Sequence, residues 1–120
     1  MKLRLALAQV NPTVADLAGN AALIKQSVDQ AVAAGAHIAI FPEMVLTGYP
    51  VEDLALRPSF QVASASALTS LATQLDKKIV SIVGYLDQVE AHVDAAAARG
   101  IYTVIDMHQD AYSAFIFTAD

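Results

Sequence analysis

Residues 31–43 read AVAAGAHIAIFPE, and our expectation for the fold starts from these residues. An alanine-rich helix end runs into Gly35, an apolar run follows over residues 37–41, and the carboxylate of Glu43 comes just after it. A glycine directly past a helix is a common way for helices to end, and a short apolar run bounded by turn residues is typical of a buried strand. The stretch therefore predicts a helix-to-strand unit with an acidic side chain at the end of the strand.

The same alternation of apolar strands and amphipathic helices extends along the whole chain. Strands are predicted over residues 3–10, 79–84 and 101–106, and the tail 114–118 is a candidate fifth strand at the sheet edge. Apolar residues at helical spacing predict three intervening helices. They are Ile24, Val28, Ala31 and Val32 in the first, Phe60, Ser64, Leu68, Leu71 and Leu75 in the second, and Val89, Val93, Ala96 and Ala97 in the third.

Strands that alternate with single helices predict right-handed crossovers and a parallel sheet. We therefore expect one α/β domain over residues 1–120, a three-layer sandwich with a mostly parallel sheet of four strands, or five with the tail. Half of a (β/α)8 barrel is the alternative, because it is built from the same units. Either fold leaves a sheet edge or an apolar face uncovered in a chain of this length, which favours self-association into a homo-oligomer.

Composition narrows the classes of partner. The chain is 56% hydrophobic with a mean hydropathy of +0.47, yet no apolar run reaches the roughly 20 residues that a membrane span needs. A net charge of −5 without a basic stripe argues against nucleic acid. The absence of cysteine excludes disulfides and thiolate chemistry and is compatible with a cytoplasmic location or with recombinant expression alone. No glycine-rich phosphate loop occurs, so we expect no cofactor, and the small-molecule ligand is undetermined.

Polar side chains follow the predicted strands. In a parallel sheet the carboxyl ends of the strands share one edge, and ligands bind there. We therefore expect an acid-rich rim in which His108 titrates near neutral pH. Its members would be Asn11, Glu43, Asp87, Asp106, His108 and Asp110. Paired-carboxylate chemistry between Glu43 and Asp106 or Asp110 requires a separation of about 5–10 Å.

Each rim residue also has a structural explanation. Asn11 before Pro12 is an ordinary turn former, and Asp87 is a good N-cap for a following helix. The spacing Asp106-x-His108-x-Asp110 could hold a hard cation if it were extended. One short stretch is a weak pattern, so no metal site is expected.

Three stretches carry a family resemblance. Residues 5–20 (LALAQVNPTVADLAGN), 34–60 (AGAHIAIFPEMVLTGYPVEDLALRPSF) and 82–87 (IVGYLD) resemble the nitrilase superfamily. Within it they resemble the glutamine amidohydrolase domain of glutamine-dependent NAD synthetase. The resemblance implies that Glu43 is the general base of a Glu–Lys–Cys triad and that Tyr49 lies near the substrate amide.

The other two triad members have no match in this sequence. The family's lysine would follow residues 82–87, but the last lysine here is Lys78, and there is no cysteine. We therefore expect a domain without catalytic activity that retains remnants of an amidase site. One alternative is a weak carbon–nitrogen hydrolase that acts on an amide or on glutamine through a water activated by Glu43. The other is a glycoside-binding or glycoside hydrolase fragment.

A second resemblance covers residues 85–113, in particular GIYTVIDMHQDAYS at 100–113. It is similar to the endoglycoceramidase-like glycoside hydrolase (β/α)8 barrels, and it implies that His108 lines a sugar site. The glutamates of that family have no counterpart in the 120 residues. The two resemblances meet at Tyr85-Leu86-Asp87. This indicates a chimera, with a nitrilase-like segment over 1–87 and a barrel-like segment over 88–120, which we expect to be engineered or computer-generated. A natural recombination product is the alternative.

Overall fold

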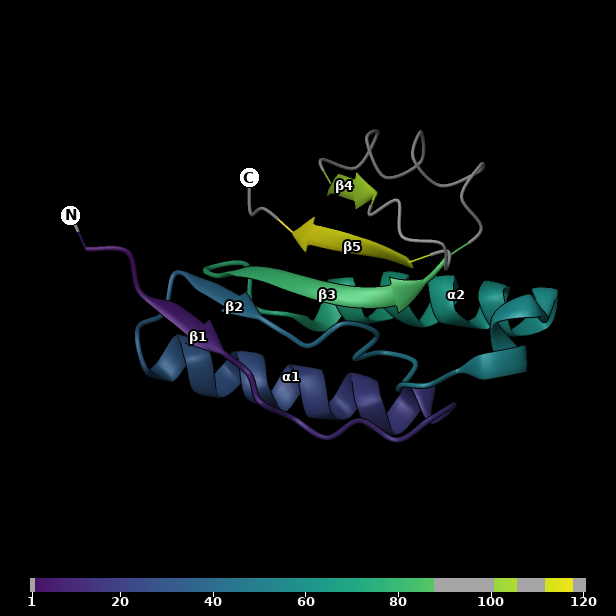
Figure 1. The fold of residues 1–120 in the computed structure, drawn as a ribbon. Coiled ribbons are helices and arrows are strands. Elements are labelled where there is room, and N and C mark those ends of the chain that lie inside the picture. The colour runs from purple at the N-terminus through teal and green to yellow at the C-terminus, as the bar shows by residue number, and fades with distance from the viewer. Residues whose placement is uncertain (1, 88–100, 106–111, 118–120) are drawn as a thin grey trace.

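The computed structural model describes residues 2–87 and the strand backbones of 101–105 and 112–117. It contains one five-stranded sheet in the order β1-β2-β3-β5-β4, with two long helices beneath it (Figure 1). The elements are β1 (Leu5–Leu7), α1 (Leu17–Ala33), β2 (Ile38–Ile40), the short 3-10 helix η1 (Glu52–Leu56), α2 (Pro58–Gln74), β3 (Val80–Leu86), β4 (Ile101–Ile105) and β5 (Tyr112–Phe117). The α/β class with a parallel sheet is confirmed.

The first three strands form the parallel part of the sheet. β1 pairs with β2 and β2 with β3, so that Leu7, Ile40 and Ile82 lie in one row across them. Both crossovers step in the same direction across the sheet. Two right-handed crossovers of that kind place their helices on one face, and α1 and α2 indeed lie together on one face (Figure 1).

The tail strand differs from the prediction. β5 does not lie at the edge: it pairs antiparallel with β3 on one side and with β4 on the other. β4 consequently runs in the direction of β3 without pairing with it. The six residues between β4 and β5, 106–111, are too few for a parallel crossover, which needs about a dozen. A short connection makes an antiparallel return, and the returning strand occupies the free edge of β3.

This antiparallel strand inside the sheet is incompatible with the half-barrel alternative, whose strands all run parallel. The third layer of the predicted sandwich would be the helix around Val89–Ala97, which lies outside the described residues.

One core fills the space between the helices and the sheet. Asp16 starts α1, because its side chain accepts a hydrogen bond from the backbone N–H of Gly19 at 2.9 Å. Pro58 starts α2 at a position where proline is favoured. The predicted faces of α1 and α2 are buried, apart from the half-buried Val32 and Phe60, and they pack against the strands. The principal members are Ile24, Val28, Leu68, Leu71, Ala39 and Val83.

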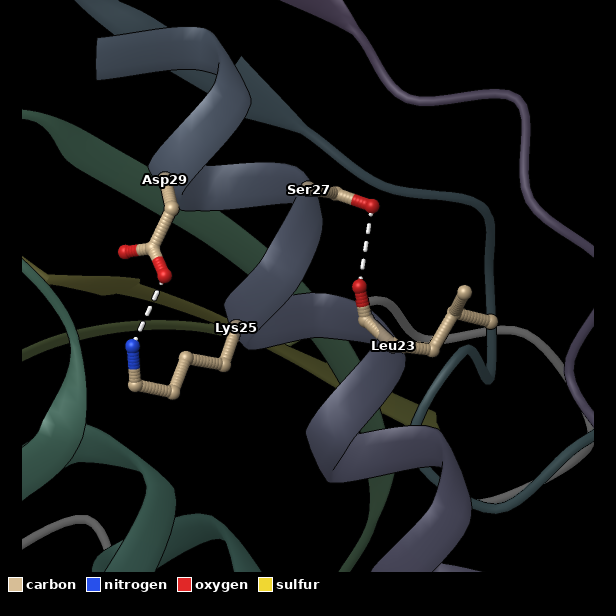
Figure 2. Close-up of polar contacts among 4 residues, drawn as sticks. All are labelled: Leu23, Lys25, Ser27 and Asp29. Atoms are coloured by element: carbon tan, nitrogen blue, oxygen red, sulfur yellow. Dashed lines mark hydrogen bonds and ion pairs between the residues drawn. The ribbon is translucent and has the colours of Figure 1, made fainter. Parts of the chain in front are cut away.

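Polar contacts lie on two different flanks of α1 (Figure 2). Lys25 and Asp29 form an ion pair at 2.8 Å, and the hydroxyl of Ser27 donates to the carbonyl of Leu23 at 2.9 Å. Both charged side chains are about half exposed, so the pair contributes only about 0.3–0.5 kcal/mol. The helix is therefore held mainly by its buried face.

The face of β1 that points away from the core is apolar and exposed. Leu3, Leu5 and Leu7 alternate along the chain and are 60%, 49% and 70% exposed. Leu5 pairs with Ile38 and Leu7 pairs with Ile40 of β2, and both isoleucines are half-buried. Within the described residues, no helix is long and apolar enough to cross a membrane.

Candidate active site

The loops after β1 and β2 enclose an open cavity of about 280 Å³ at the carboxyl edge of the sheet. Asn11 and Pro12 line it from the first loop, and Pro42, Glu43 and Tyr49 line it from the second. The structure therefore brings together three residues that the sequence singled out: Asn11, Glu43 and Tyr49. The carboxamide of Asn11 and the hydroxyl of Tyr49 can hydrogen-bond an amide, and Glu43 carries a carboxylate.

A rigid turn presents Glu43 to this cavity. The backbone N–H groups of Thr47 and Gly48 donate to the carbonyl of Met44 at 3.1 and 2.8 Å. Met44 adopts a positive φ of 56°, and its side chain is fully buried. Glu43, which directly precedes Met44, is exposed. A buried anchor thus holds the turn while the carboxylate stays in water, which avoids the cost of burying a charge.

The neighbouring strand β3 fixes the position of this turn. Gly84 of β3 lies directly against it, and a Cβ at this position would be 2.7 Å from the backbone nitrogen of Met44 and 3.4 Å from the Cα of Glu43. The carbonyl of Gly84 accepts a hydrogen bond from the N–H of Leu46 at 3.2 Å. This close approach requires glycine.

The two loops that line the cavity are joined to each other. The N–H of Ala15 donates to the carbonyl of Thr47 at 2.9 Å. Gly48, with φ +78°, lies so close that a Cβ would be 2.6 Å from the Cα of Val14. Tyr49 follows, 66% exposed, with a cis peptide bond to Pro50. The walls of the cavity are therefore one connected unit.

Sequence reasoning missed two residues that shape this unit, Gly84 and Asn20. A signal for Asn20 was present, because it lies four residues before Ile24 and eight before Val28, on the buried face of α1. A polar residue on an apolar face needs hydrogen-bond partners. For Gly84 the available signal was a glycine within a predicted apolar strand, which often marks the close approach of another backbone.

Asp87 ends β3 at the same edge of the sheet but does not line the cavity. It is 6% exposed, and the hydroxyl of Tyr85 donates a hydrogen bond to its carboxylate. Its role as an N-cap concerns a helix after residue 87, outside the described residues, and stays a prediction.

Asp106, His108 and Asp110 also lie outside the described residues, so their place in the rim and the sugar-site role of His108 stay predictions. Within the part of the chain that is described, no group of three or more His, Cys, Asp and Glu side chains could hold a metal ion.

The chain belongs to the carbon–nitrogen hydrolase family, because the sequence model of that family matches residues 4–109. The match runs through Tyr85-Leu86-Asp87, where the sequence suggested a junction. The nitrilase-superfamily part of the resemblance is thereby confirmed. The glycoside hydrolase part and the chimera stay predictions.

Glutamine-dependent NAD(+) synthetases are among the similar proteins. The enzyme from Rhodobacter capsulatus is 40% identical over 93 residues, which cover 76% of this chain and 17% of the relative. The enzyme from Thermotoga maritima is 37% identical over 113 residues, or 88% of this chain and 20% of the relative. The chain thus spans only about a fifth of these relatives or less.

Solved structures agree. A glutamine-dependent NAD(+) synthetase from Cytophaga hutchinsonii matches with a TM-score of 0.70 and 26% identity, over 75% of this chain and 15% of the other. An amidase from Nesterenkonia sp. matches with a TM-score of 0.56 and 24% identity, over 68% of this chain and 31% of the other, which shows the fold alone. Family membership does not support the expectation of an inactive domain, and the carbon–nitrogen hydrolase alternative fits better.

Proposed function

We propose that this chain hydrolyses carbon–nitrogen bonds, with Glu43 as the general base and the side-chain carboxamide of glutamine as substrate. One observation carries the proposal: Glu43 lines a cavity with Asn11 and Tyr49 in a chain of the carbon–nitrogen hydrolase family. Relatives named for their dependence on glutamine support the choice of substrate.

The chemistry follows from the groups at the cavity. The 120 residues contain no cysteine, so we assign water as the nucleophile within this chain. Glu43 accepts a proton from the water while the oxygen of the water attacks the carboxamide carbon. The carbon–nitrogen bond then breaks, the leaving nitrogen takes up the proton, and glutamate and ammonia are released. In this proposal Asn11 and the Tyr49 hydroxyl, which line the same cavity, hydrogen-bond the carboxamide.

Ammonia release from L-glutamine tests the proposal. We expect Glu43→Gln to lower the rate by about 10²-fold or more, because general-base assistance contributes about 10²–10⁴-fold. Glu52→Gln is the matched control, since it removes the same charge from an exposed residue of η1 outside the cavity lining. Release that is undetectable, or that survives Glu43→Gln unchanged in a highly purified sample, would contradict the proposal.

A further inference from the structure

A buried amide side chain lies behind the two loops of the cavity. Asn20, in the N-terminal part of α1, is only 2% exposed. Its Nδ2 donates to the carbonyl of Thr13 at 2.8 Å and to the carbonyl of Leu46 at 3.0 Å. Its Oδ1 accepts from the N–H of Thr13 at 2.8 Å. Both donors and the acceptor of the carboxamide are therefore used.

These hydrogen bonds connect the two walls. Thr13 directly follows Asn11 and Pro12, which line one side of the cavity. Leu46 belongs to the turn that starts from Glu43 on the other side. One buried side chain on α1 thus joins the two lining segments, in addition to the direct hydrogen bond between Ala15 and Thr47.

The chemistry of the contact requires asparagine. The two backbone carbonyls need two N–H donors, and the Thr13 N–H needs an acceptor on the same planar group. Aspartate would offer only acceptors and would place a carboxylate against two carbonyl oxygens. Serine is too short to span both loops with one hydroxyl.

From this arrangement we propose that Asn20 is a positioning residue, which fixes the separation between Asn11 and the Glu43–Tyr49 wall of the cavity. The inference rests on the proposed function for its consequence, since misplacing a base by about 1 Å can cost about 10²-fold in rate. The separation itself can be measured without any substrate.

The absence of native cysteine makes the measurement direct. Asn11→Cys and Tyr49→Cys are combined, both sites are spin-labelled, and dipolar broadening reports the separation of the two walls. The pair is placed in four backgrounds: the otherwise unchanged chain, Asn20→Asp, Asn20→Ser and Val28→Ala. Val28 is fully buried on the same helix, so its truncation lowers stability without removing the hydrogen bonds to the loops. All samples are compared where circular dichroism shows them folded, and Asn20→Ser serves if Asn20→Asp does not fold.

We expect the separation to widen or its distribution to broaden in the Asn20 variants and to stay unchanged in Val28→Ala. We also expect ammonia release from L-glutamine, measured without the labels, to fall about ten- to a hundredfold in the Asn20 variants alone. An unchanged separation in a folded Asn20 variant, or an equal change in Val28→Ala, would overturn the positioning role. A widened separation with an unaltered rate would also overturn it. If the unsubstituted chain releases no ammonia, the proposed function fails, and the separation still decides the role of Asn20.

Discussion

Gly84 of β3 lies in contact with the backbone of Met44, so that a Cβ on the glycine would be 2.7 Å from the Met44 nitrogen. Met44 is the residue after Glu43, and its buried side chain anchors the turn that presents the carboxylate. The position of the candidate base is therefore set by a glycine that lies 41 residues further along the chain.

Substitution of this glycine should displace the turn. We expect Gly84→Ala to lower the free energy of unfolding by about 1–3 kcal/mol, because the new methyl group meets backbone that cannot rotate away. It should also lower ammonia release from L-glutamine. Ser81→Ala on the same strand is the control, because the Ser81 hydroxyl is buried without a hydrogen-bond partner among the described residues and its loss should be nearly neutral. Urea denaturation measures the free energy of unfolding of both variants. Equal losses of stability in the two would count against a tight contact between Gly84 and the Met44 backbone.

The two glycines with positive φ should differ in their tolerance of alanine. Gly48 and Gly35 have φ of +78° and +71°, so each substitution incurs about 1–2 kcal/mol of backbone strain. At Gly48 the Cβ also meets the backbone of Val14, whereas at Gly35 it meets the mobile end of the Arg4 side chain at 2.8 Å. We expect Gly48→Ala to be clearly the more destabilising in urea denaturation. The reverse order would contradict the tight joining of the two loops.

The start of α1 offers a test of local energetics. Removing the cap with Asp16→Ala should lower the free energy of unfolding by about 0.5–2 kcal/mol. Asp29→Ala, which breaks the exposed pair with Lys25, should cost at most about 0.5 kcal/mol. Thermal or urea unfolding of the two variants at the same salt concentration compares them. A larger effect at Asp29 would mean that the ion pair matters more than the cap.

The exposed apolar row on β1 should govern self-association. We expect the unfolding midpoint of the unchanged chain to rise with protein concentration, because association stabilises the folded state. Leu7→Lys, at a 70% exposed position, should remove this dependence with little effect on the folding of the dilute chain. Sedimentation at two concentrations about a hundredfold apart supplies the independent measurement. A midpoint that is independent of concentration in the unchanged chain would exclude association through this face.

Much of the first two-thirds of the fold could be predicted from periodicity. The helix faces around Ile24 and Leu68 are buried as the spacing indicated, and Gly35 follows the end of α1. The first two strands are shorter than predicted: β1 spans three residues rather than the eight of 3–10, and β2 spans three rather than the five of 37–41. By contrast, β3 (Val80–Leu86) extends beyond the predicted 79–84. Apolar character does not coincide with the part of a strand that has a hydrogen-bonded neighbour, so sequence locates strand ends poorly.

The candidate site was only partly predictable. Glu43 and Asn11 were identified because each follows a predicted strand, and the parallel direction of β1 and β2 brings their ends together. Asn20 and Gly84 were missed, because their importance depends on which backbone lies opposite them. The sequence marks each as unusual for its element, a polar residue on an apolar helix face and a glycine within a strand, but it does not reveal the partner.

The alternation of strands and helices, the parallel pairing of the first three strands and the polar residues at their carboxyl ends could all be inferred from the sequence, because they follow from local periodicity and the handedness of crossovers. The place where the tail strand inserts depends on the assembled sheet, since β3 offers a free edge to any strand that can reach it, in either direction. The spacing of the cavity walls likewise depends on tertiary contacts, because hydrogen bonds from Asn20 and the close approach at Gly84 join segments that are distant in sequence.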